Sequence, residues 1–248
     1  MKIAVAQTRP AKGDVLRNLE AHIRLIGSAA SENVTHLIFP ELSVTGYEPS
    51  LAASLVMEAG DARLDVLQTL SDRHLMTICA GVPTTGAAGI LISMAIFQPG
   101  QERQVYSKQY LHADEVPFFA GGPAPVRLEN NKIALAICYE LSVPEHSRDA
   151  RRAGAEIYLA SVAKAKSGME KAAAGLEAIA RQYGMWVMVC NCVGHCDDFD
   201  CGGGSAAWDK AGMLLGQLND TEEGLLILDT AEAQVVKRAT GNEIYEDH

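Results

Sequence analysis

The stretch Lys132-Ile133-Ala134-Leu135-Ala136-Ile137-Cys138 is an apolar run of strand length, and it begins like Lys2-Ile3-Ala4-Val5-Ala6 near the start of the chain. Short apolar runs of this kind are typical of buried strands. A motif that recurs in each half of a chain favours two related halves packed together. We therefore expect each copy to form a buried strand in one of two such halves.

Further apolar runs alternate with helical patterns, which is the sequence form of a layered α/β protein. Strands are predicted at residues 3–7, 36–39, 76–82, 90–97, 104–110, 133–138, 157–161, 186–193, 206–209 and 225–228. Asp14 is suited to cap a helix whose predicted apolar face comprises Leu16, Leu19, Ile23, Ile26 and Ala30. No low-complexity linker interrupts the pattern, so we expect one domain over residues 1–248.

The composition is that of an ordinary globular protein, with 48% hydrophobic and 21% charged residues. The formal net charge of −10 and the lack of a basic run argue against a nucleic-acid partner, because neutralising phosphates requires clustered cations. The longest apolar stretch, Met185–Cys190, is far shorter than the about 20 residues that span a bilayer. No targeting segment follows Met1. We therefore expect a cytoplasmic protein with neither a nucleic-acid nor a membrane partner.

Glu41, Lys108 and Cys138 each close an apolar, strand-like stretch. Side chains at strand ends share the edge of an open α/β sheet, where ligand sites collect. A cysteine attacks as its thiolate, which needs a nearby base or cation at neutral pH. A carboxylate can accept the thiol proton, and an ammonium can hold the charge that develops on a carbonyl oxygen. Taken alone, each residue is ordinary, but together they are the minimum set for acyl transfer.

Four stretches, residues 3–7, 39–47, 106–111 and 137–145, match the motifs of one known family in their order along the chain. The likeness extends to Arg148, Gly154-Ala155, Ala180-Arg181, Asn191, Gly194, Gly204-Ser205 and Asp209. On these residues the sequence resembles the nitrilase superfamily of carbon–nitrogen hydrolases. The resemblance implies a four-layer α-β-β-α sandwich.

The resemblance also implies a Glu-Lys-Cys triad, which falls here on Glu41, Lys108 and Cys138. In that family the glutamate activates the cysteine, which attacks an amide carbonyl or a nitrile carbon. Ammonia or an amine leaves, and water then resolves the thioester. Lys108 and the backbone N–H of Tyr139 would form the oxyanion site. Neither a metal nor an organic cofactor is then needed.

Many members of the family carry a second glutamate after the lysine, which orients the lysine and the substrate. Glu115 is the candidate here, with Asp114 as its rival. Phe118 and Phe119 are candidates for the pocket rim, with plain packing as the alternative. Glu140 is expected to support either the site or the fold.

The implied function is thiol-dependent hydrolysis of a small linear amide to a carboxylic acid and ammonia, with nitrilase or N-carbamoyl hydrolase activity as alternatives. The family implies a homodimer or a higher homo-oligomer. Many relatives use a longer C-terminal tail in dimer contacts, whereas only a short charged tail is expected here after Asp229. Arg148 or Lys164 could select acidic substrates, although surface salt bridges are favoured for both.

A cluster of Cys190, Cys192, His195, Cys196 and Cys201 departs from the family pattern. Thiols and imidazoles are zinc ligands, but this run lacks the paired Cys-x₂-Cys spacing of structural zinc sites. Plain structural thiols are favoured, so no metal site is predicted, while a redox-sensitive loop and a metal site stay open as alternatives. Cys79, outside the cluster, is expected in the core.

Two other function classes compete with the leading one. Cys138 could pair with a histidine, as in other cysteine hydrolases, but no histidine lies in a recognisable partner motif; the candidates are His36, His74, His112, His146 and His195. A non-catalytic metabolite-binding protein, or a redox- or metal-responsive protein that uses the Cys190–Cys201 cluster, is the alternative of another class. The intact triad favours the hydrolase.

Overall fold

The computed structural model describes residues 1–58 and 60–239, whose strands form two large sheets and one small one. The first sheet contains, in spatial order, β15 (Gln234–Ala239), β14 (Gly224–Asp229), β1 (Lys2–Gln7), β2 (His36–Ile38), β3 (Thr77–Gly86), β4 (Gly89–Phe97) and β5 (Gln104–Ser107). The second contains β13 (Leu214–Gln217), β12 (Ala206–Trp208), β9 (Trp186–Cys190), β8 (Ile157–Ser161), β7 (Ile133–Ile137) and β6 (Arg127–Leu128). The small sheet is a hairpin of β10 (Val193–Cys196) and β11 (Phe199–Gly202).

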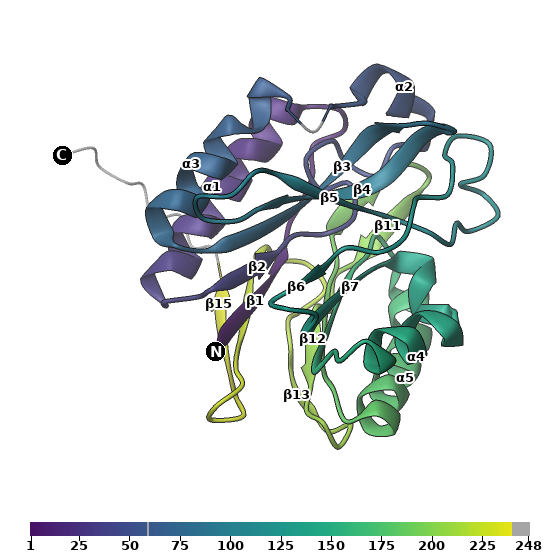
Figure 1. The fold of residues 1–248 in the computed structure, drawn as a ribbon. Helices are drawn as coiled ribbons and strands as arrows, with labels where there is room; N and C mark the ends of the chain where they lie inside the picture. The colour runs from purple at the N-terminus through teal and green to yellow at the C-terminus, as the bar shows by residue number, and fades with distance from the viewer. Residues whose placement is uncertain (59, 240–248) are drawn as a thin grey trace.

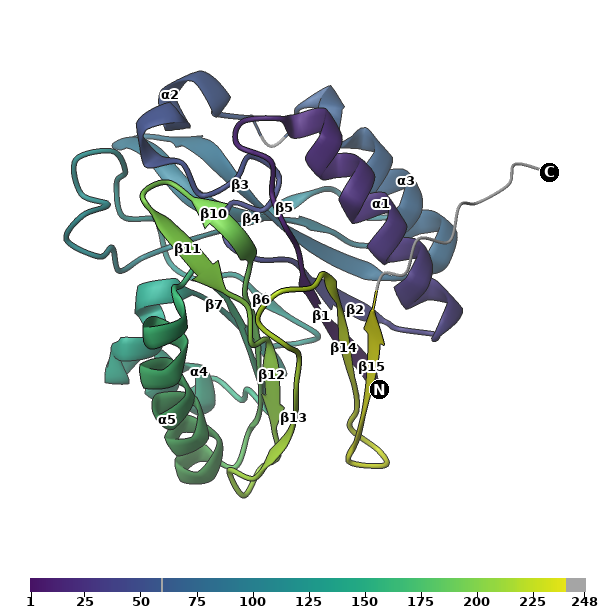
Figure 2. The ribbon, with the colours of Figure 1, turned by 180° about the vertical axis from the view of Figure 1, so that it is seen from behind.

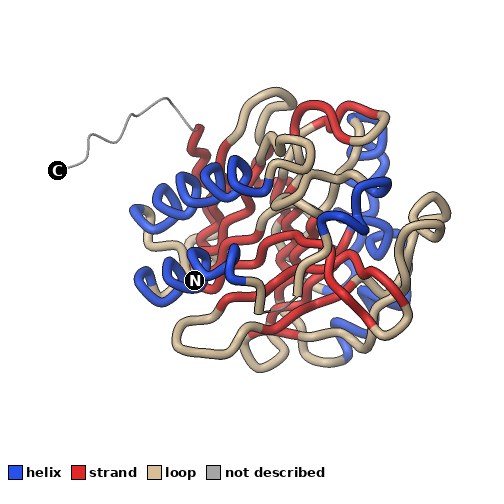
Figure 3. The backbone as a smooth tube through the Cα atoms, turned by 90° about the horizontal axis from the view of Figure 1, so that it is seen from above, coloured by secondary structure: helices blue, strands red, loops and turns tan. Residues whose placement is uncertain are grey.

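Helices cover the outer faces of the two large sheets, as Figures 1 and 2 show from opposite sides. The first sheet carries α1 (Val15–Ser31) and α3 (Asp65–His74), and the second carries α4 (Pro144–Arg152) and α5 (Lys166–Tyr183). From above, the strands lie in the middle with helices on either side (Figure 3). The remaining helical turns are η1 (Pro49–Leu51), α2 (Ala52–Leu55), η2 (Ala62–Leu64) and η3 (Cys138–Ser142). This arrangement confirms the predicted α-β-β-α sandwich.

Within the described ranges, no helix combines the length and the apolar character that crossing a membrane requires.

The two copies of the repeated motif occupy equivalent places in the two sheets. Strand β1 lies between antiparallel β14 and parallel β2. Strand β7 lies between antiparallel β6 and parallel β8. Each parallel pair is joined through a helix, α1 in the first half and α4 in the second, as a parallel crossover requires. The topology therefore agrees with two related halves.

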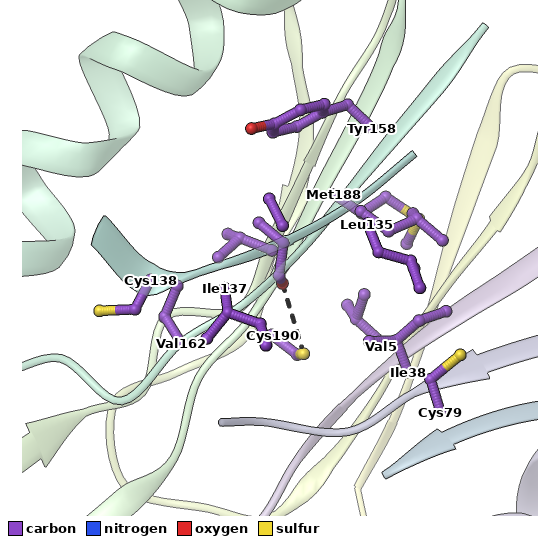
Figure 4. Close-up of a cluster of buried hydrophobic side chains, with 14 of the residues drawn as sticks. Val5, Ile38, Cys79, Leu135, Ile137, Cys138, Tyr158, Val162, Met188 and Cys190 are labelled. Carbon is purple, nitrogen blue, oxygen red and sulfur yellow. Dashed lines mark hydrogen bonds between the residues drawn. The ribbon is translucent and has the colours of Figure 1, made fainter. Parts of the chain in front are cut away.

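The inner faces of the two sheets share one hydrophobic core. Val5 and Ile38 of the first sheet belong to the same cluster as Leu135 and Met188 of the second (Figure 4). Alternate residues point the other way, because side chains alternate across a strand. Ala4 accordingly packs with the helices on the outer face of its sheet.

Helix α1 buries a different face from the one that apolar periodicity predicts. Asp14 caps the helix as expected. Leu16 and Ile23, however, are exposed, and the buried face includes the polar residues Asn18 and His22. The predicted apolar face is therefore correct at Leu19 and Ile26, which are buried, and wrong at Leu16 and Ile23.

Asn18 and His22 are buried because their polar atoms are satisfied by the chain that follows β2. The Asn18 amide donates to the Val44 carbonyl at 3.0 Å. The His22 ring lies 2.9 Å from the Ser43 hydroxyl and stacks on Phe39 at 4.0 Å between ring centroids. Helix α1 thereby holds the turn after β2 in place.

The structure corrects two further predictions. The predicted strand 186–193 is interrupted, since β9 ends at Cys190 and β10 begins at Val193. Between them the Asn191 N–H donates to the Ser205 hydroxyl at 3.0 Å, and the Asn191 side chain donates to the carbonyls of Lys164 and Gly203 at 2.9 and 2.8 Å. Where a charged tail was predicted, β15 pairs with β14, and Val235 packs against the core. The rest of that predicted tail, residues 240–248, lies outside the described residues.

Gly81 of β3 lies directly against the turn that follows β2. A Cβ atom at this position would lie 2.3 Å from the Leu42 nitrogen and 2.4 Å from the Pro40 oxygen. The strand can approach this turn so closely only because it carries no side chain there. Glu41 lies between Pro40 and Leu42 in this turn. The close approach that Gly81 allows therefore helps to fix the position of Glu41.

We expect Gly81→Ala to destabilise the protein by about 1–3 kcal/mol, the usual cost of overpacking a tight interior, because the backbone of the turn must move. The free energy of unfolding in urea measures this. Gly175→Ala is the matched control, since Gly175 lies in α5 and a Cβ atom there would meet nothing within 4 Å. That change should be neutral or stabilise by about 0.5–1 kcal/mol through helix propensity. Equal stability of the two variants would contradict the steric argument.

Candidate active site

Three strand ends converge between the two large sheets. Glu41 lies in the turn after β2, Lys108 directly follows β5, and Cys138 follows β7 as the first residue of η3. The side chains of Glu41 and Lys108 are fully buried, and Cys138 is 9% exposed. A Ser161 hydroxyl from β8 donates to the Phe39 carbonyl at 2.8 Å and ties the two sheets together beside this point.

The Lys108 ammonium lies between two carboxylates. Its Nζ donates to Glu41 Oε1 at 2.8 Å and to Glu115 Oε1 at 2.5 Å. Glu115 is 1% exposed. A buried lysine is tolerated only when charge and hydrogen bonds compensate its lost hydration, and two anions provide this here. The structure thus brings Glu115, rather than Asp114, to the lysine.

Further hydrogen bonds hold both carboxylates in position. Glu41 Oε2 accepts from the Ala163 N–H at 3.1 Å, in the segment after β8. Glu115 Oε2 accepts from the His112 N–H at 2.7 Å. The Tyr47 hydroxyl donates to Glu115 Oε1 at 3.2 Å. Tyr47 has no role in the sequence prediction, although it ends the 39–47 motif, because spacing alone does not show where its hydroxyl points.

Cys138 has an unusual backbone conformation for a residue with a side chain. Its φ is 44°, in the left-handed region that non-glycine residues seldom adopt. Such conformations cost about 1–3 kcal/mol and cluster at functional sites. The sharp turn from β7 into η3 directs Sγ away from the core side chains around Ile137 and Cys190 (Figure 4). The strained turn, rather than an absence of packing, sets Cys138 apart, because the residue still belongs to the buried core cluster.

The site keeps the thiol protonated and the lysine charged. Burial and the negative charge of Glu41 raise the pKa of the Cys138 thiol to about 12, against the opposing charge of Lys108. Burial lowers the pKa of Lys108, but the carboxylates of Glu41 and Glu115 outweigh it, so that this pKa is raised overall. Burial also raises the pKa of Glu41, although Lys108 opposes the rise. A thiol beside a base with a raised pKa is suited to proton transfer during attack.

Glu140 connects the lysine and cysteine segments. Its Oε1 accepts from the Gln109 N–H at 2.6 Å, next to Lys108. Its Oε2 accepts from the Ile137 N–H at 2.7 Å, next to Cys138, and from the Tyr106 hydroxyl at 2.6 Å. The carboxylate is fully buried. Glu140 therefore supports both the fold and the placement of two site residues.

A neutral histidine completes the hydrogen bonding around Glu140. Burial lowers the pKa of His146 to about 4, so the ring has one donor and one acceptor at neutral pH. Its Nε2 lies 2.9 Å from the Tyr106 hydroxyl and its Nδ1 lies 2.8 Å from the Tyr158 hydroxyl. Because Tyr106 donates to Glu140, we assign the donor to Nε2 and the acceptor to Nδ1.

The candidate rim residues differ in exposure. Phe119 is 5% exposed and belongs to the core cluster, so packing describes it better than the pocket rim. Phe118 and Tyr139 are exposed. The Tyr139 ring meets His112 edge-on, with 5.4 Å between ring centroids.

The two candidate selectors of acidic substrates, Arg148 and Lys164, differ in their position relative to the candidate site. Arg148 lies on the exposed side of α4 and pairs with Asp149 at 3.0 Å, as the salt-bridge alternative predicts. Lys164 is half-buried, and its charge is close enough to Cys138 to oppose the rise in thiol pKa that burial causes. Lys164, rather than Arg148, therefore lies near the candidate nucleophile.

Most histidines proposed as partners of Cys138 interact elsewhere. His36 interacts with Glu129, and His112 interacts with Asp114. His146 lies between the hydroxyls of Tyr106 and Tyr158, and His195 interacts with Asp200. His74 closes α3, on the outer face of the first sheet.

The remaining cysteines fall into two groups. Cys79 and Cys190 are buried separately, and the Cys190 thiol donates to the Ala160 carbonyl at 3.4 Å (Figure 4). Cys192, Cys196 and Cys201 converge instead, and among the described residues they are the group whose atoms are close enough to hold a metal ion.

Comparison with known proteins agrees with this geometry. Residues 2–238 match the family model described as carbon-nitrogen hydrolase. The chain is 25% identical over 244 residues to an (R)-stereoselective amidase from Pseudomonas sp, covering 96% of this chain and 88% of that protein. A mutant of the amidase from Nesterenkonia sp. AN1 in complex with butyramide has a TM-score of 0.83 at 25% identity, covering 94% of this chain and 92% of that one.

A second mutant of the Nesterenkonia amidase shows the acetamide moiety of fluoroacetamide added covalently at the active-site cysteine. Its TM-score is 0.83 at 26% identity, and the match covers 92% of this chain and 90% of that one.

We expect the alkylation rate of Cys138 by iodoacetamide to keep rising to about pH 10, well beyond the ordinary thiol pKa of about 8.5. Glu41→Gln removes an anion that raises the thiol pKa. The thiolate should therefore form at lower pH, and the rate profile should move to lower pH. Mass spectrometry of the peptide that contains Cys138, after timed exposure at each pH, measures the rate.

Glu145→Gln is the matched control, because Glu145 is an exposed carboxylate on α4. Its alkylation profile should coincide with that of the unmodified protein. A wild-type profile that levels off near the ordinary thiol pKa, with no change in Glu41→Gln, would show that Glu41 does not act on the thiol.

Proposed function

The chain belongs to the carbon–nitrogen hydrolase family as an amidase-like member of the nitrilase superfamily, and on this premise we propose that it hydrolyses a small linear amide at Cys138. The products are a carboxylic acid and ammonia. The observation that carries the proposal is the buried Lys108 ammonium, held between Glu41 and Glu115. Both Lys108 and Glu41 are close enough to act on the pKa of the Cys138 thiol, which lies at a strained turn.

Glu41 is the proposed general base. Its Oε1 accepts from Lys108 and its Oε2 from Ala163, and each carboxylate oxygen has a second lone pair. In the first step the thiol proton passes to Glu41 while Sγ bonds to the amide carbon. Glu41 then gives this proton to the nitrogen as the C–N bond breaks, so ammonia leaves and a thioester remains.

Water completes the cycle in the same geometry. It gives a proton to Glu41 while its oxygen attacks the thioester carbon. The C–S bond then breaks, the carboxylic acid leaves, and the proton on Glu41 returns to the Cys138 sulfur. Protons and electrons therefore balance over the cycle, and Glu41 ends in its initial state.

Lys108 is the proposed oxyanion stabiliser. An ammonium has three N–H donors, and the two carboxylates accept two of them. The third is free to donate to the oxygen on which negative charge develops, and the Tyr139 N–H is proposed as a second donor. Stabilising charge in a site shielded from water typically contributes about 10²–10³ in rate for each donor.

Glu115 has a different proposed role from Glu41, because more of its hydrogen-bonding capacity is used. Oε1 accepts from both Lys108 and Tyr47, and Oε2 accepts from His112. We assign Glu115 to orienting the lysine and the substrate.

The substrate class follows from the relatives rather than from one pocket residue. Amidases are among the proteins that match over most of this chain, and the structure of one of them contains butyramide. Short aliphatic amides are therefore the first substrates to test, with nitriles and N-carbamoyl compounds as the alternatives.

The core shared by both large sheets supports the accompanying proposal that residues 1–248 form one domain.

We expect the protein to release ammonia from butyramide and Cys138→Ala to lower kcat at least about 10³-fold, because no other group replaces a lost nucleophile. Glu41→Gln should lower kcat by about 10²–10⁴ through loss of general-base catalysis. A coupled ammonia assay over a panel of short amides, nitriles and N-carbamoyl compounds measures both effects.

Cys79→Ala is the matched control, since Cys79 is a fully buried cysteine within β3. It should keep most of the activity while losing some stability. If Cys138→Ala turned over the panel as fast as Cys79→Ala, the proposed nucleophile would be wrong. Turnover of nitriles or N-carbamoyl compounds alone would replace the amide proposal while keeping the cysteine.

A further inference from the structure

Three thiols from one short segment face one another beside the candidate active site. Cys192 precedes β10, Cys196 ends β10, and Cys201 lies in β11. Their sulfur atoms all lie within 4.8 Å of one another, and Cys201 Sγ lies 3.1 Å from Cys196 Sγ. The three residues are 0%, 1% and 4% exposed. All are free thiols in the structure.

From this geometry we infer that Cys192, Cys196 and Cys201 form a binding site for a thiophilic metal ion, Zn²⁺ or Cu⁺. This departs from the expectation of plain structural thiols drawn from the spacing. The inference is independent of the proposed amide hydrolysis, because none of the three cysteines belongs to the Lys108 group.

The hairpin explains why the spacing was misleading. Side chains alternate across a strand, so adjacent His195 and Cys196 of β10 point to opposite faces. The His195 side chain is 67% exposed and pairs with Asp200 at 3.1 Å. Cys190 bonds Ala160 within the second sheet. His195 and Cys190 are therefore not part of the site, and the three thiols of Cys192, Cys196 and Cys201 remain as its ligands.

The three sulfur atoms are close enough together to share one metal ion. Two thiolates on one tetrahedral zinc ion lie about 3.8 Å apart, because each Zn–S bond is about 2.3 Å. The observed contact of 3.1 Å and the limit of 4.8 Å lie on either side of that value. The 3.1 Å contact is also much longer than the about 2.05 Å of a disulfide bond.

The chemistry of the donors selects the kind of ion. An all-thiolate set prefers soft or borderline ions such as Cu⁺ and Zn²⁺ over Mg²⁺ or Ca²⁺, which prefer oxygen. Three ligands suit three-coordinate Cu⁺ directly, whereas Zn²⁺ would take a water or solute in its fourth position. Binding releases protons from the thiols, because the thiolate is the ligand.

The position of the site indicates what a bound ion would do. The Gly203 N–H donates to the Cys192 carbonyl, the Val193 N–H donates to the Thr8 carbonyl after β1, and the Gly202 N–H donates to the Lys164 carbonyl before α5. Three thiolates on one ion would therefore cross-link the 192–201 segment, which these backbone bonds join to segments of both large sheets. We expect a structural role for the ion, seen as raised stability.

The same hairpin contacts residues that lead to the candidate active site. The Phe199 ring packs edge-on against Tyr47, with 6.0 Å between centroids. The Asp197 N–H donates to Glu48 at 3.2 Å. Tyr47 in turn donates to Glu115. An ion that stiffens the hairpin would act on the site through Tyr47, and not by touching the substrate.

The test measures metal binding directly, in protein that carries the Cys138→Ala change. This change removes Cys138, which is the most exposed of the cysteines that do not belong to the three-thiol group. Protein prepared under reduction and stripped with a chelator is titrated with Cd²⁺, whose thiolate charge-transfer absorption reports sulfur ligation. Samples loaded with Zn²⁺ or with Cu⁺ are desalted, and their metal content is measured. We expect one ion per chain and a higher thermal midpoint in the loaded protein.

Cys196→Ser and Cys201→Ser should lose the Cd²⁺ band and the retained ion, whereas Cys190→Ser should keep both. Cys190 is the matched control because it is equally buried in the same segment but bonds Ala160 instead. Circular dichroism checks that each variant is folded. Alkylation under partial denaturation provides a readout without these variants, because the ion should protect Cys192, Cys196 and Cys201 but not Cys79.

The Zn²⁺ and Cu⁺ samples decide which ion the site takes. Failure to retain either ion after desalting would overturn the inference, as would equal Cd²⁺ binding by the three serine variants. A Cys196–Cys201 disulfide in metal-free protein as isolated would also overturn it, in favour of a redox-sensitive pair. None of these outcomes bears on whether Cys138 hydrolyses amides.

Discussion

The buried ammonium of Lys108 is the interaction on which the rest of the site depends. A lysine with no exposed side chain loses its hydration, and only paired charges compensate that loss. Glu41 and Glu115 are both within hydrogen-bonding distance, at 2.8 and 2.5 Å. Removing one partner of such a buried pair usually costs about 3–5 kcal/mol. The turn after β2, the end of β5 and the 112–115 turn must therefore be in place together.

The two sheets provide that arrangement jointly, since neither supplies it alone. Glu41 belongs to the first sheet, yet its second oxygen accepts from Ala163 beyond β8 of the second. Glu140 reaches from η3, beyond the second sheet, to the backbone beside Lys108 at the end of the first. The groups that position the charges therefore cross the interface between the halves. Packing of the two inner faces is a precondition of the site as well as of the core.

Two chemically different groups lie close together in this region. The Lys108 group consists of one ammonium nitrogen and the oxygen atoms of two carboxylates in a shielded place. The Cys192, Cys196 and Cys201 group consists of sulfur, which binds soft ions in preference to hard ones. Tyr47 connects them, because it packs against Phe199 of the hairpin and donates to Glu115. Tyr47 is thus the contact through which the proposed ion would act on Glu115.

The sequence by itself determined the layered fold, most of the strands, and the prominence of Glu41, Lys108 and Cys138, because strand periodicity and the order of motifs are local properties of the chain. The family resemblance also pointed to Glu115, with Asp114 as its rival, and the structure decided between the two. Only the tertiary structure decided that α1 buries Asn18 and His22, because their partners come from the turn after β2. Only the tertiary structure likewise showed the three hydrogen bonds that Glu140 accepts. It alone also showed that Cys192, Cys196 and Cys201 lie together. Which side chains share a space depends on packing between segments that lie far apart in the chain, and on the direction in which each strand turns its side chains, and neither can be read from spacing.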